Sequence, residues 1–568
     1  MEASAMPEVT RRTAAVFALC LISLSSVAQP APLTTGETIE VSLVNVDVFV
    51  TDRDGNRVRG LTAADFEIRE GGRLQPITNF TEYAPLDART GYARETGEAA
   101  AASAPAASTT PAAAKRAIVV FIESVTLAPF RAKPIFDSIR AMLRRTVRPG
   151  DAVAVVSWLN ASLVRQDFTD DLDLIERALD DIEEENTGPE GNYADQMRRR
   201  GEFAQAFQRE LVAAGYPTSE AELTTSSALS VAQAELFEIR QKSFALRAYM
   251  EAIAGFEGKK ILIMATKRFG EYAGSEYFGG DVPFRHRSDL ETRPYREAVI
   301  DTANANNITI YPIYPRGLGN SILAGADESG RAMGLIDRDA DLRRFSADNY
   351  KLLNETTSLH EIAHRTGGVL AWGSKDIAQL MPRIADDLDS YYSLAYRATS
   401  SGRDEARSIR VTARNGDYVV RARREYVEKS DETRMSDLVV ANLVRVSPGG
   451  TLPIRVEVGD ITRDGRRRSV PLRIRIPVDA LTTIEGGGTF AVYLASGGAF
   501  GVISEVDRRT QRYTLEHVRL ATADDDAFTY DVTLKIERGA YRLSIGILDE
   551  VSKEYGLAHV ELPLEDGE

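Results

Sequence analysis

Apolar residues recur along the middle of the chain in short continuous runs that alternate with amphipathic stretches. The run at 115–125, KRAIVVFIESV, is predicted to form a strand buried on both faces, because Ile, Val and Phe occupy consecutive positions. Similar runs follow at 152–159, 260–265, 308–314, 369–372 and 391–396. Helical patterns separate them, and the alternation from 115 to 398 predicts an α/β domain with a doubly wound, mainly parallel sheet.

The regions on either side of this unit have the alternating pattern of half-buried strands. Residues 37–86 are predicted to form a small β module, with an Asp/Gly turn at DRDGNR. Residues 399–430 predict a β-hairpin extension about Asn415-Gly416. Residues 431–568 contain several short strands with turn signals between them, which favours a C-terminal β-sandwich domain.

Two polar segments interrupt this pattern. Residues 87–114, with AAASAPAASTTPAAA at their centre, are predicted to be a low-complexity linker, because they have too little apolar bulk to fold and enough Pro to stay extended. Residues 185–225 are polar and punctuated by Gly and Pro, so they are predicted to be an insertion in the α/β unit.

Residues 1–28 have the pattern of a signal peptide. Arg11 and Arg12 supply a positive charge, and Thr13–Val27 is apolar but too short to span a bilayer. Small residues at the end of this stretch predict cleavage after Ala28. The sequence therefore predicts an exported protein that is secreted or stays in the periplasm or cell envelope. No later segment is long and apolar enough to predict a transmembrane helix.

Composition and charge narrow the function classes. The chain has 568 residues, of which 43% are hydrophobic and 27% charged, as in ordinary globular proteins. Its formal net charge of −15 argues against a nucleic-acid partner, since nothing would offset the repulsion from phosphates. The only cysteine, Cys20, lies in the signal segment, which excludes disulfides and thiol catalysis from the mature chain. No phosphate loop or dinucleotide fingerprint occurs in a suitable setting, so no cofactor is predicted.

Several segments together resemble a known family. VSLVNVDVFVTDRDGNRVRGLTAADFEIREGGRLQPITNF resembles the N-terminal module of the secreted bacterial family called VWFA-related, acidobacterial type. The segments KRAIVVFIES, GFEGKKILIMAT, HEIAHRTGGVLAW and IADDLDSYYSLAYRA are similar to landmarks of that family's von Willebrand factor A-like domain. The resemblance runs from about 40 to 427. It implies an exported protein with an A-domain fold and no established enzymatic activity. A-domains generally mediate protein–protein contacts, often through a metal held by an Asp-x-Ser-x-Ser tip.

The tip of this chain departs from that pattern. Ligands of doubly wound sheets bind beyond the carboxyl ends of the strands. There the resemblance places Glu123 at the family's Asp position and Val125 and Leu127 at its two Ser positions. A hard divalent cation needs oxygen ligands, and neither Val nor Leu has any. The segment after 260–265, where a further acid would stand, is Thr-Lys-Arg at 266–268, and its two cations would repel a third. The sequence therefore predicts a degenerate tip that binds no metal.

A second motif points to different chemistry. His360-Glu361-x-x-His364 matches the helical zinc signature, in which two histidines bind the metal and the glutamate acts as a base. The longer form of this signature would place a third histidine where Leu370 stands. An acid from 386–389 could be the third ligand, but it would belong to the next predicted helix. A secreted zinc metallopeptidase is therefore an alternative function.

The same motif also fits a helix of the α/β unit that binds no metal. At about 100° per residue, Leu352, Leu359 and Ala363 share one side of the helix, which predicts the face that packs in the core. Gly367 and Gly368 would end this helix. We favour this interpretation, which leaves the chain without a catalytic residue.

These observations predict an exported, non-enzymatic protein–protein interaction or adhesion-type protein. Its partner would be a protein of unknown identity. Besides the zinc peptidase, a structural component of the cell envelope stays open as an alternative, because the two flanking β regions could join β-rich assemblies.

Overall fold

The structure is a computed structural model, and the ranges that it describes cover most of the chain after residue 40. They are 41–83, 116–124, 129–159, 162–187, 220–256, 258–267, 269–275, 282, 284–315, 352, 354–372, 374–399, 401–446, 449–465, 467–484, 486–498, 502–514, 527–537 and 539–563. The predicted signal peptide, the predicted linker, the tip positions Val125 and Leu127, and most of the predicted insertion lie outside these residues.

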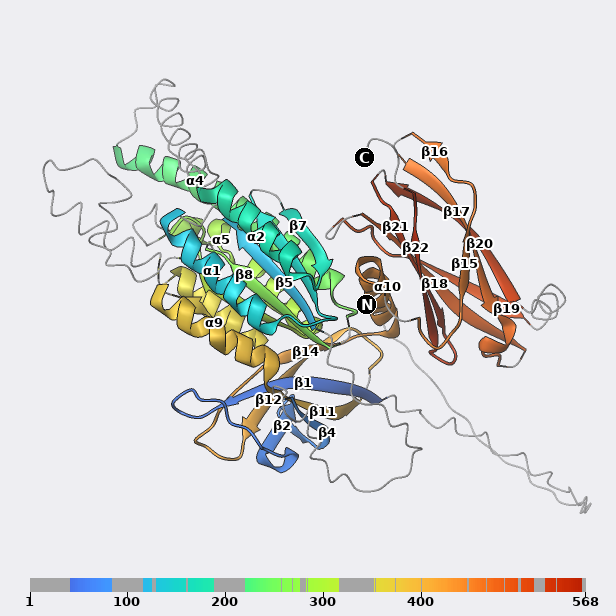
Figure 1. Ribbon diagram of the computed structural model, residues 1–568, viewed down its shortest axis with the longest axis horizontal. Coiled ribbons are helices and arrows are strands. Elements are labelled where there is room, and N and C mark those ends of the chain that lie inside the picture. Colours follow the sequence, from blue (N-terminus) through green and yellow to red (C-terminus); the bar gives the residue numbers. More distant parts are fainter. Residues whose placement is uncertain are drawn as a thin grey trace, which may run out of the picture. The chain divides into compact units, whose positions relative to one another are not determined.

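A six-stranded sheet forms the centre of the α/β unit (Figure 1). Its strands are β5 (Arg116–Glu123), β6 (Ala152–Trp158), β7 (Ser162–Thr169), β8 (Lys259–Ala265), β9 (Ile308–Tyr314) and β10 (Ala371–Trp372). They lie in the order β10-β9-β8-β5-β6-β7, and every neighbouring pair is parallel except β6 and β7. The predicted α/β unit with a mainly parallel sheet is confirmed.

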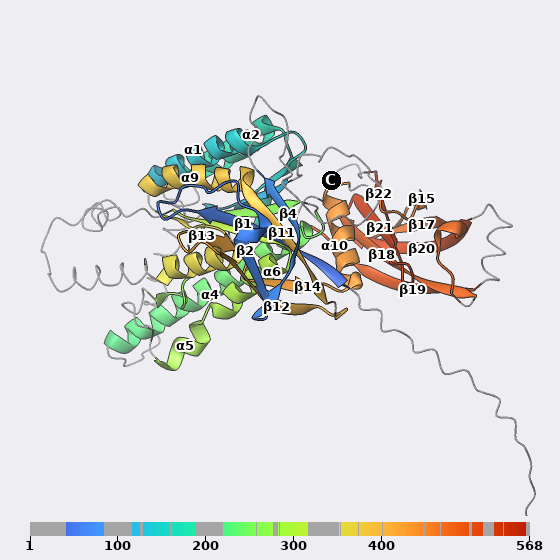
Figure 2. The ribbon, with the colours of Figure 1, turned by 90° about the horizontal axis from the view of Figure 1, so that it is seen from below.

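Helices cover both faces of this sheet (Figure 2). One face carries α1 (Pro129–Thr146), α2 (Leu172–Thr187) and α9 (Ser374–Asp389), and the other carries α4 (Glu220–Ala252), α6 (Arg293–Ala305) and the helix at 354–366. A short helix, α5 (Phe284–Leu290), packs against α4 through Leu290 and Ala232. Because side chains alternate along a strand, Ile118 and Val120 of β5 belong to different faces from Val119 and Phe121. The sheet is therefore doubly wound.

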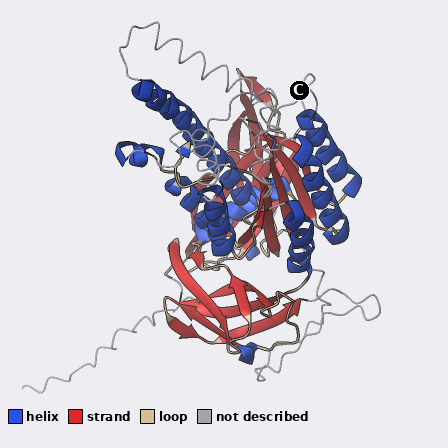
Figure 3. Ribbon diagram, turned by 90° about the vertical axis from the view of Figure 1, so that its left-hand side faces the viewer, coloured by secondary structure: helices blue, strands red, loops and turns tan. Residues whose placement is uncertain are grey.

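Eight further strands, from two separate parts of the chain, form a β module (Figure 3). They are β1 (Val41–Thr51), β2 (Phe66–Glu70), β3 (Arg73–Gln75), β4 (Ile77–Tyr83), β11 (Tyr391–Thr399), β12 (Glu405–Ala413), β13 (Val419–Ala422) and β14 (Glu425–Glu428), with the short helix η1 (Ala63–Asp65). They make two sheets, β13-β1-β11-β4 and β14-β12-β2-β3. Alternate residues of β1, from Val44 to Val50, are buried in their shared core.

The prediction that residues 391–396 close the α/β unit is wrong. Instead, β11 is antiparallel to β1 and β4 in the β module. As the strand between these two it is buried along most of its length, so its continuous apolar run resembles that of a parallel core strand. The predicted hairpin about Asn415-Gly416 is present at its base, where residues 405–408 of β12 pair with β14. Toward the turn its two arms separate, because residues 409–413 pair with β2 while β13 pairs with β1.

The C-terminal part begins with a helix that the sequence analysis did not predict, α10 (Asp431–Val444). Ser430 caps it by accepting a hydrogen bond from the Thr433 amide at 3.2 Å. Two sheets follow, built from β15 (Arg455–Val458), β16 (Thr462–Asp464), β17 (Arg467–Pro477) and β20 (Ala527–Glu537), and from β18 (Gly487–Gly497), β19 (Asp507–Thr514), β21 (Arg542–Asp549) and β22 (Tyr555–Glu561), with the short helix η4 (Val478–Ala480) after β17. The sheets share one apolar core, and Met435 and Val439 of α10 pack on the other side of β18 and β21. In the part of the chain that the structure describes, no helix is long and apolar enough to span a membrane.

Candidate functional site at the carboxyl ends of β5 and β8

The order of the parallel strands defines one place where a ligand of this unit would bind. From β5 the chain adds β6 and β7 on one side and then β8, β9 and β10 on the other, so the direction of winding reverses between β5 and β8. Ligands of doubly wound sheets bind at this reversal, beyond the carboxyl ends of the strands. Glu123 ends β5 there, and Thr266 and Lys267 directly follow β8.

Glu123 lies at the bottom of this tip and is 2% exposed. Its Oε2 atom accepts hydrogen bonds from the Thr266 hydroxyl at 2.6 Å and from the Lys267 backbone amide at 3.0 Å. The ammonium of Lys242 donates to the same oxygen at 3.2 Å. One oxygen of this buried carboxylate therefore accepts three hydrogen bonds.

Lys242, in the middle of α4, places its ammonium among the polar groups of the tip. Its side chain is 1% exposed, and besides Glu123 it donates to the Thr266 hydroxyl at 3.0 Å and to the Lys267 carbonyl at 2.9 Å. An ammonium has three N–H donors, and these three oxygens can accept all of them. The Nζ atom also lies 4.5 Å from the centre of the Phe269 ring, a distance at which the ring attracts a cation.

The described residues of the tip do not fit a divalent metal. Calcium and magnesium need six or more oxygen ligands, including water, at about 2.0–2.6 Å. Here the nearest carboxylate oxygen already binds a fixed positive charge, and a second cation beside Lys242 would meet its repulsion in a site of low dielectric constant. No group of three or more His, Cys, Asp or Glu side chains in the described ranges is placed to hold a metal.

Sequence analysis singled out Glu123 and the segment at 266–268 but missed Lys242. The signal for it was present, because Lys242 falls on the helical stripe of Ile239, Leu246 and Tyr249, which are buried against the sheet. A lysine at a core-facing position of a helix needs a partner inside the protein. That pattern could have predicted a buried lysine, although not the identity of its partner.

The HEIAH motif lies elsewhere, in the helix at 354–366. The rings of His360 and His364 are stacked with their centres 5.9 Å apart. The Nε2 atom of His364 lies 3.0 Å from an Arg424 nitrogen. Partial desolvation of this otherwise exposed ring, together with the positive charge of Arg424 and the neighbouring His360, lowers the pKa of His364. A neutral imidazole nitrogen that accepts a hydrogen bond from arginine is not free to bind zinc.

The other residues of the zinc alternative are engaged as well. The Glu361 carboxylate lies 2.9 Å from Nε of Arg296, whose side chain is largely buried, and 3.6 Å from Arg365. Leu370 is 7% exposed and packs in the core. The acids that could supply a third ligand belong to α9, on the opposite face of the sheet, and each contacts an arginine: Asp386 contacts Arg145, Asp387 contacts Arg421, and Asp389 contacts Arg116.

The apolar stripe predicted for this helix is confirmed. Leu359 and Ala363 are buried in the core on the α4 side of the sheet, and Leu352 packs against that core. The two histidines of the motif are exposed.

Comparisons with known proteins add little. No protein-family model matches the chain, and no curated protein matches its sequence. Among solved structures, proximal thread matrix protein 1 from the mussel byssus is similar over 48% of this chain and 47% of its own length, with 10% identity and a TM-score of 0.22. The von Willebrand factor domain of the type V pilus tip protein from Porphyromonas gingivalis is similar over 48% of this chain and 94% of its own, with 12% identity and a TM-score of 0.21. A von Willebrand factor type A protein from Catenulispora acidiphila is similar over 80% and 68%, with 9% identity and a TM-score of 0.23. Likeness at this level says nothing about the activity or partners of this chain.

Proposed function

We propose that this is an exported, non-enzymatic protein-binding protein built on a von Willebrand factor A-like unit, and that it binds its partner without a metal. The observation that carries the proposal is the buried contact between Glu123 and Lys242 at the tip. The family resemblance implies that this place can hold a bridging metal. In this chain an internal ammonium, bonded to three protein oxygens, supplies the positive charge instead.

A fixed internal cation has a direct consequence for binding. A metal at a tip can keep an open coordination position for an acid of the partner, but the donors of Lys242 are directed at Glu123, Thr266 and Lys267. Glu123, Thr266 and Lys242 are then part of the scaffold, and contact with a partner depends on surface side chains rather than on a coordination bond.

The proposed export rests on the pattern of residues 1–28, and N-terminal sequencing of the native protein would test it by detecting Gln29 as the first residue. The zinc peptidase alternative is less well supported, because arginines contact both Glu361 and His364. A non-enzymatic role fits these contacts better.

Affinity capture tests metal independence. The mature chain would be immobilised and exposed to envelope extract in two buffers, one with EDTA and one with magnesium and calcium. We expect the same partner in equal amount from both, because the tip needs no metal. A partner that is lost in EDTA and recovered on adding magnesium would contradict the proposal.

A further inference from the structure

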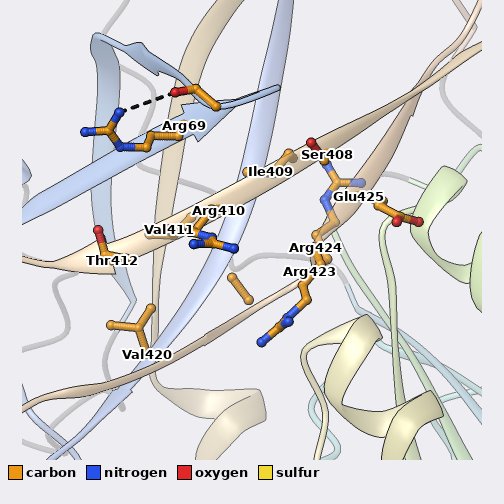
Figure 4. A pocket seen from close by; sticks show the side chains of 12 residues that line it. Arg69, Ser408, Ile409, Arg410, Val411, Thr412, Val420, Arg423, Arg424 and Glu425 are labelled. Atoms are coloured by element: carbon orange, nitrogen blue, oxygen red, sulfur yellow. Dashed lines mark hydrogen bonds between the residues drawn. The ribbon is translucent and has the colours of Figure 1, made fainter.

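The β module contains an opening where two strands that follow each other in the chain separate (Figure 4). Near their base they are joined, because the Ile409 amide donates to the Arg424 carbonyl at 2.7 Å. Beyond that point residues 410–413 of β12 pair with β2, and β13 pairs with β1, in a different sheet. The turn at Asn415 rejoins the two strands. The opening between them has a volume of about 600 Å³.

No strand that the structure describes lies between the two edges that face each other across this opening. Among the described strands, β13 has β1 as its only neighbour, and residues 410–413 have only β2. Backbone amide and carbonyl groups on such an edge are a template for an added strand, because they need hydrogen-bond partners. An extended peptide supplies these partners in the form that the edge requires.

The side chains around the opening carry a strong positive charge. Four of the lining residues are arginines, and the only acid is Glu425, which already pairs with Arg365 at 3.5 Å. The arginines are Arg69, Arg410, Arg423 and Arg424. This concentration stands out in a chain whose formal net charge is −15.

Two of these four arginines, Arg410 and Arg424, have capacity for an anion. The Arg410 side chain is exposed and forms no hydrogen bond or ion pair with a residue that the structure describes. Arg424 contacts the ring of His364 and no carboxylate within the described ranges. The other two arginines are already engaged: Arg423 donates to the carbonyls of Asn304 and Asn45, and Arg69 donates to the Gly72 carbonyl at 3.3 Å and lies 3.8 Å from the Glu67 carboxylate.

We propose that this opening binds an extended acidic peptide segment of a protein partner, with carboxylates on Arg410 and Arg424 and the peptide backbone along the free strand edges. Guanidinium groups suit this role, since they bind carboxylates with two parallel hydrogen bonds. The inference rests on the proposed function for its partner class, and it places the contact on the β module rather than on the tip of the α/β unit.

The test uses the mature chain and two labelled peptides, one of alternating Glu and Val and one of alternating Gln and Val, measured by fluorescence anisotropy. We expect the acidic peptide to bind and the Gln peptide to bind at least about tenfold more weakly, because hydrogen bonds between charged groups are the stronger ones. The double variant Arg410→Gln, Arg424→Gln should weaken binding of the acidic peptide by about tenfold or more.

The matched control is Arg59→Gln, Arg397→Gln, which removes two exposed arginines of the same module that do not line the opening. It should leave binding within about twofold of wild type, because only screened long-range charge changes. Circular dichroism melts of all variants report whether each one is folded.

Three outcomes would overturn the inference: equal binding of both peptides, unchanged binding by the Arg410/Arg424 variant, or binding of inorganic phosphate without any binding of the acidic peptide. The last result would assign a small-anion site instead. If metal-independent capture of a partner persists in the Arg410/Arg424 variant, the proposed function stands and only the peptide site is rejected.

Discussion

Two lysines are buried at opposite ends of the central sheet, and their surroundings differ. At the carboxyl end the ammonium of Lys242 contacts the Glu123 carboxylate, and its side chain is 1% exposed. At the amino end Lys259, which begins β8 and is 2% exposed, donates to the backbone carbonyl of Asp387 at 2.7 Å. Its Nζ atom lies 4.3 Å from the centre of the Phe49 ring and 3.9 Å from that of Tyr391, both from the β module.

The two lysines show that a buried amino group can serve two different purposes. Lys242 neutralises the Glu123 carboxylate, so this buried acid needs no external ion. Lys259 makes no hydrogen bond to a carboxylate of a described residue, and burial lowers its pKa to about 7 although the nearby Asp47 carboxyl acts in the opposite direction. The first lysine fixes the chemistry of a potential ligand site, whereas the second fills a packing position between the sheet and the β module.

The largest effect is expected from Lys242→Met, which leaves Glu123 buried without its cation. Removing one partner of a buried ion pair costs about 3–5 kcal/mol of unfolding free energy, because the remaining buried charge has lost its counter-ion. Urea unfolding of the mature chain near neutral pH would measure the loss. The matched control is Lys133→Met on α1, whose side chain is 71% exposed beside Asp137 and which should cost less than about 1 kcal/mol.

Two further measurements sharpen this result. Adding Glu123→Gln to Lys242→Met should recover part of the lost stability, since no buried charge is then left unpaired. Magnesium or calcium should not raise the unfolding midpoint of the wild-type chain. A clear increase would show that the tip binds the metal despite Lys242, and the comparison between the two ends of the sheet would fail.

An intermediate loss of stability is expected from Glu361→Gln. This variant tests whether losing one charge of an ion pair is costly only when, as at Glu123, that charge is buried. The Glu361 side chain is 37% exposed, unlike Glu123, but it faces the buried guanidinium of Arg296. We expect a loss of about 1 kcal/mol, reduced by solvent screening of the pair. The same preparation would be analysed for zinc after purification without chelator or metal-affinity resin. One equivalent of zinc per chain, lost in His360→Ala, His364→Ala, would instead support the peptidase alternative.

Sequence patterns predicted the features that depend on local periodicity. The buried runs identified β5, β6, β8 and β9, and the helical stripe through Leu359 and Ala363 identified a core-packed face. The contact between Glu123 and Lys242 was not predicted, because it joins residues 119 positions apart and depends on how α4 lies across the sheet. The sheet membership of β11 was missed for a related reason, since burial on both faces gives the same pattern in either sheet.

The smallest net effect is expected from Lys259→Met. Methionine keeps apolar contact with Phe49 and Tyr391 but loses one hydrogen bond and the attraction of the rings for a cation, and it also removes the cost of burying an ammonium. These terms oppose each other, so the variant should lie within about 1 kcal/mol of wild type near pH 7.

The pH dependence of this variant separates the cost of burying the Lys259 ammonium from the other contributions to stability. The pKa of Lys259 is about 7 in the folded state and 10.5 without burial, so between these values the unfolded chain binds more protons. The folded wild type therefore gains stability as the pH rises from about 7 toward 10, and it loses that stability as the pH falls back. Methionine does not titrate, so Lys259→Met should become less stable relative to wild type as the pH rises. Lys260, whose pKa burial also lowers to about 7, and Asp47, whose pKa burial raises, are present in both proteins. Urea unfolding at several pH values would measure this divergence. Parallel stability curves would mean that Lys259 stays charged between its two aromatic rings, and the contrast with Lys242 would then lie in the partner alone.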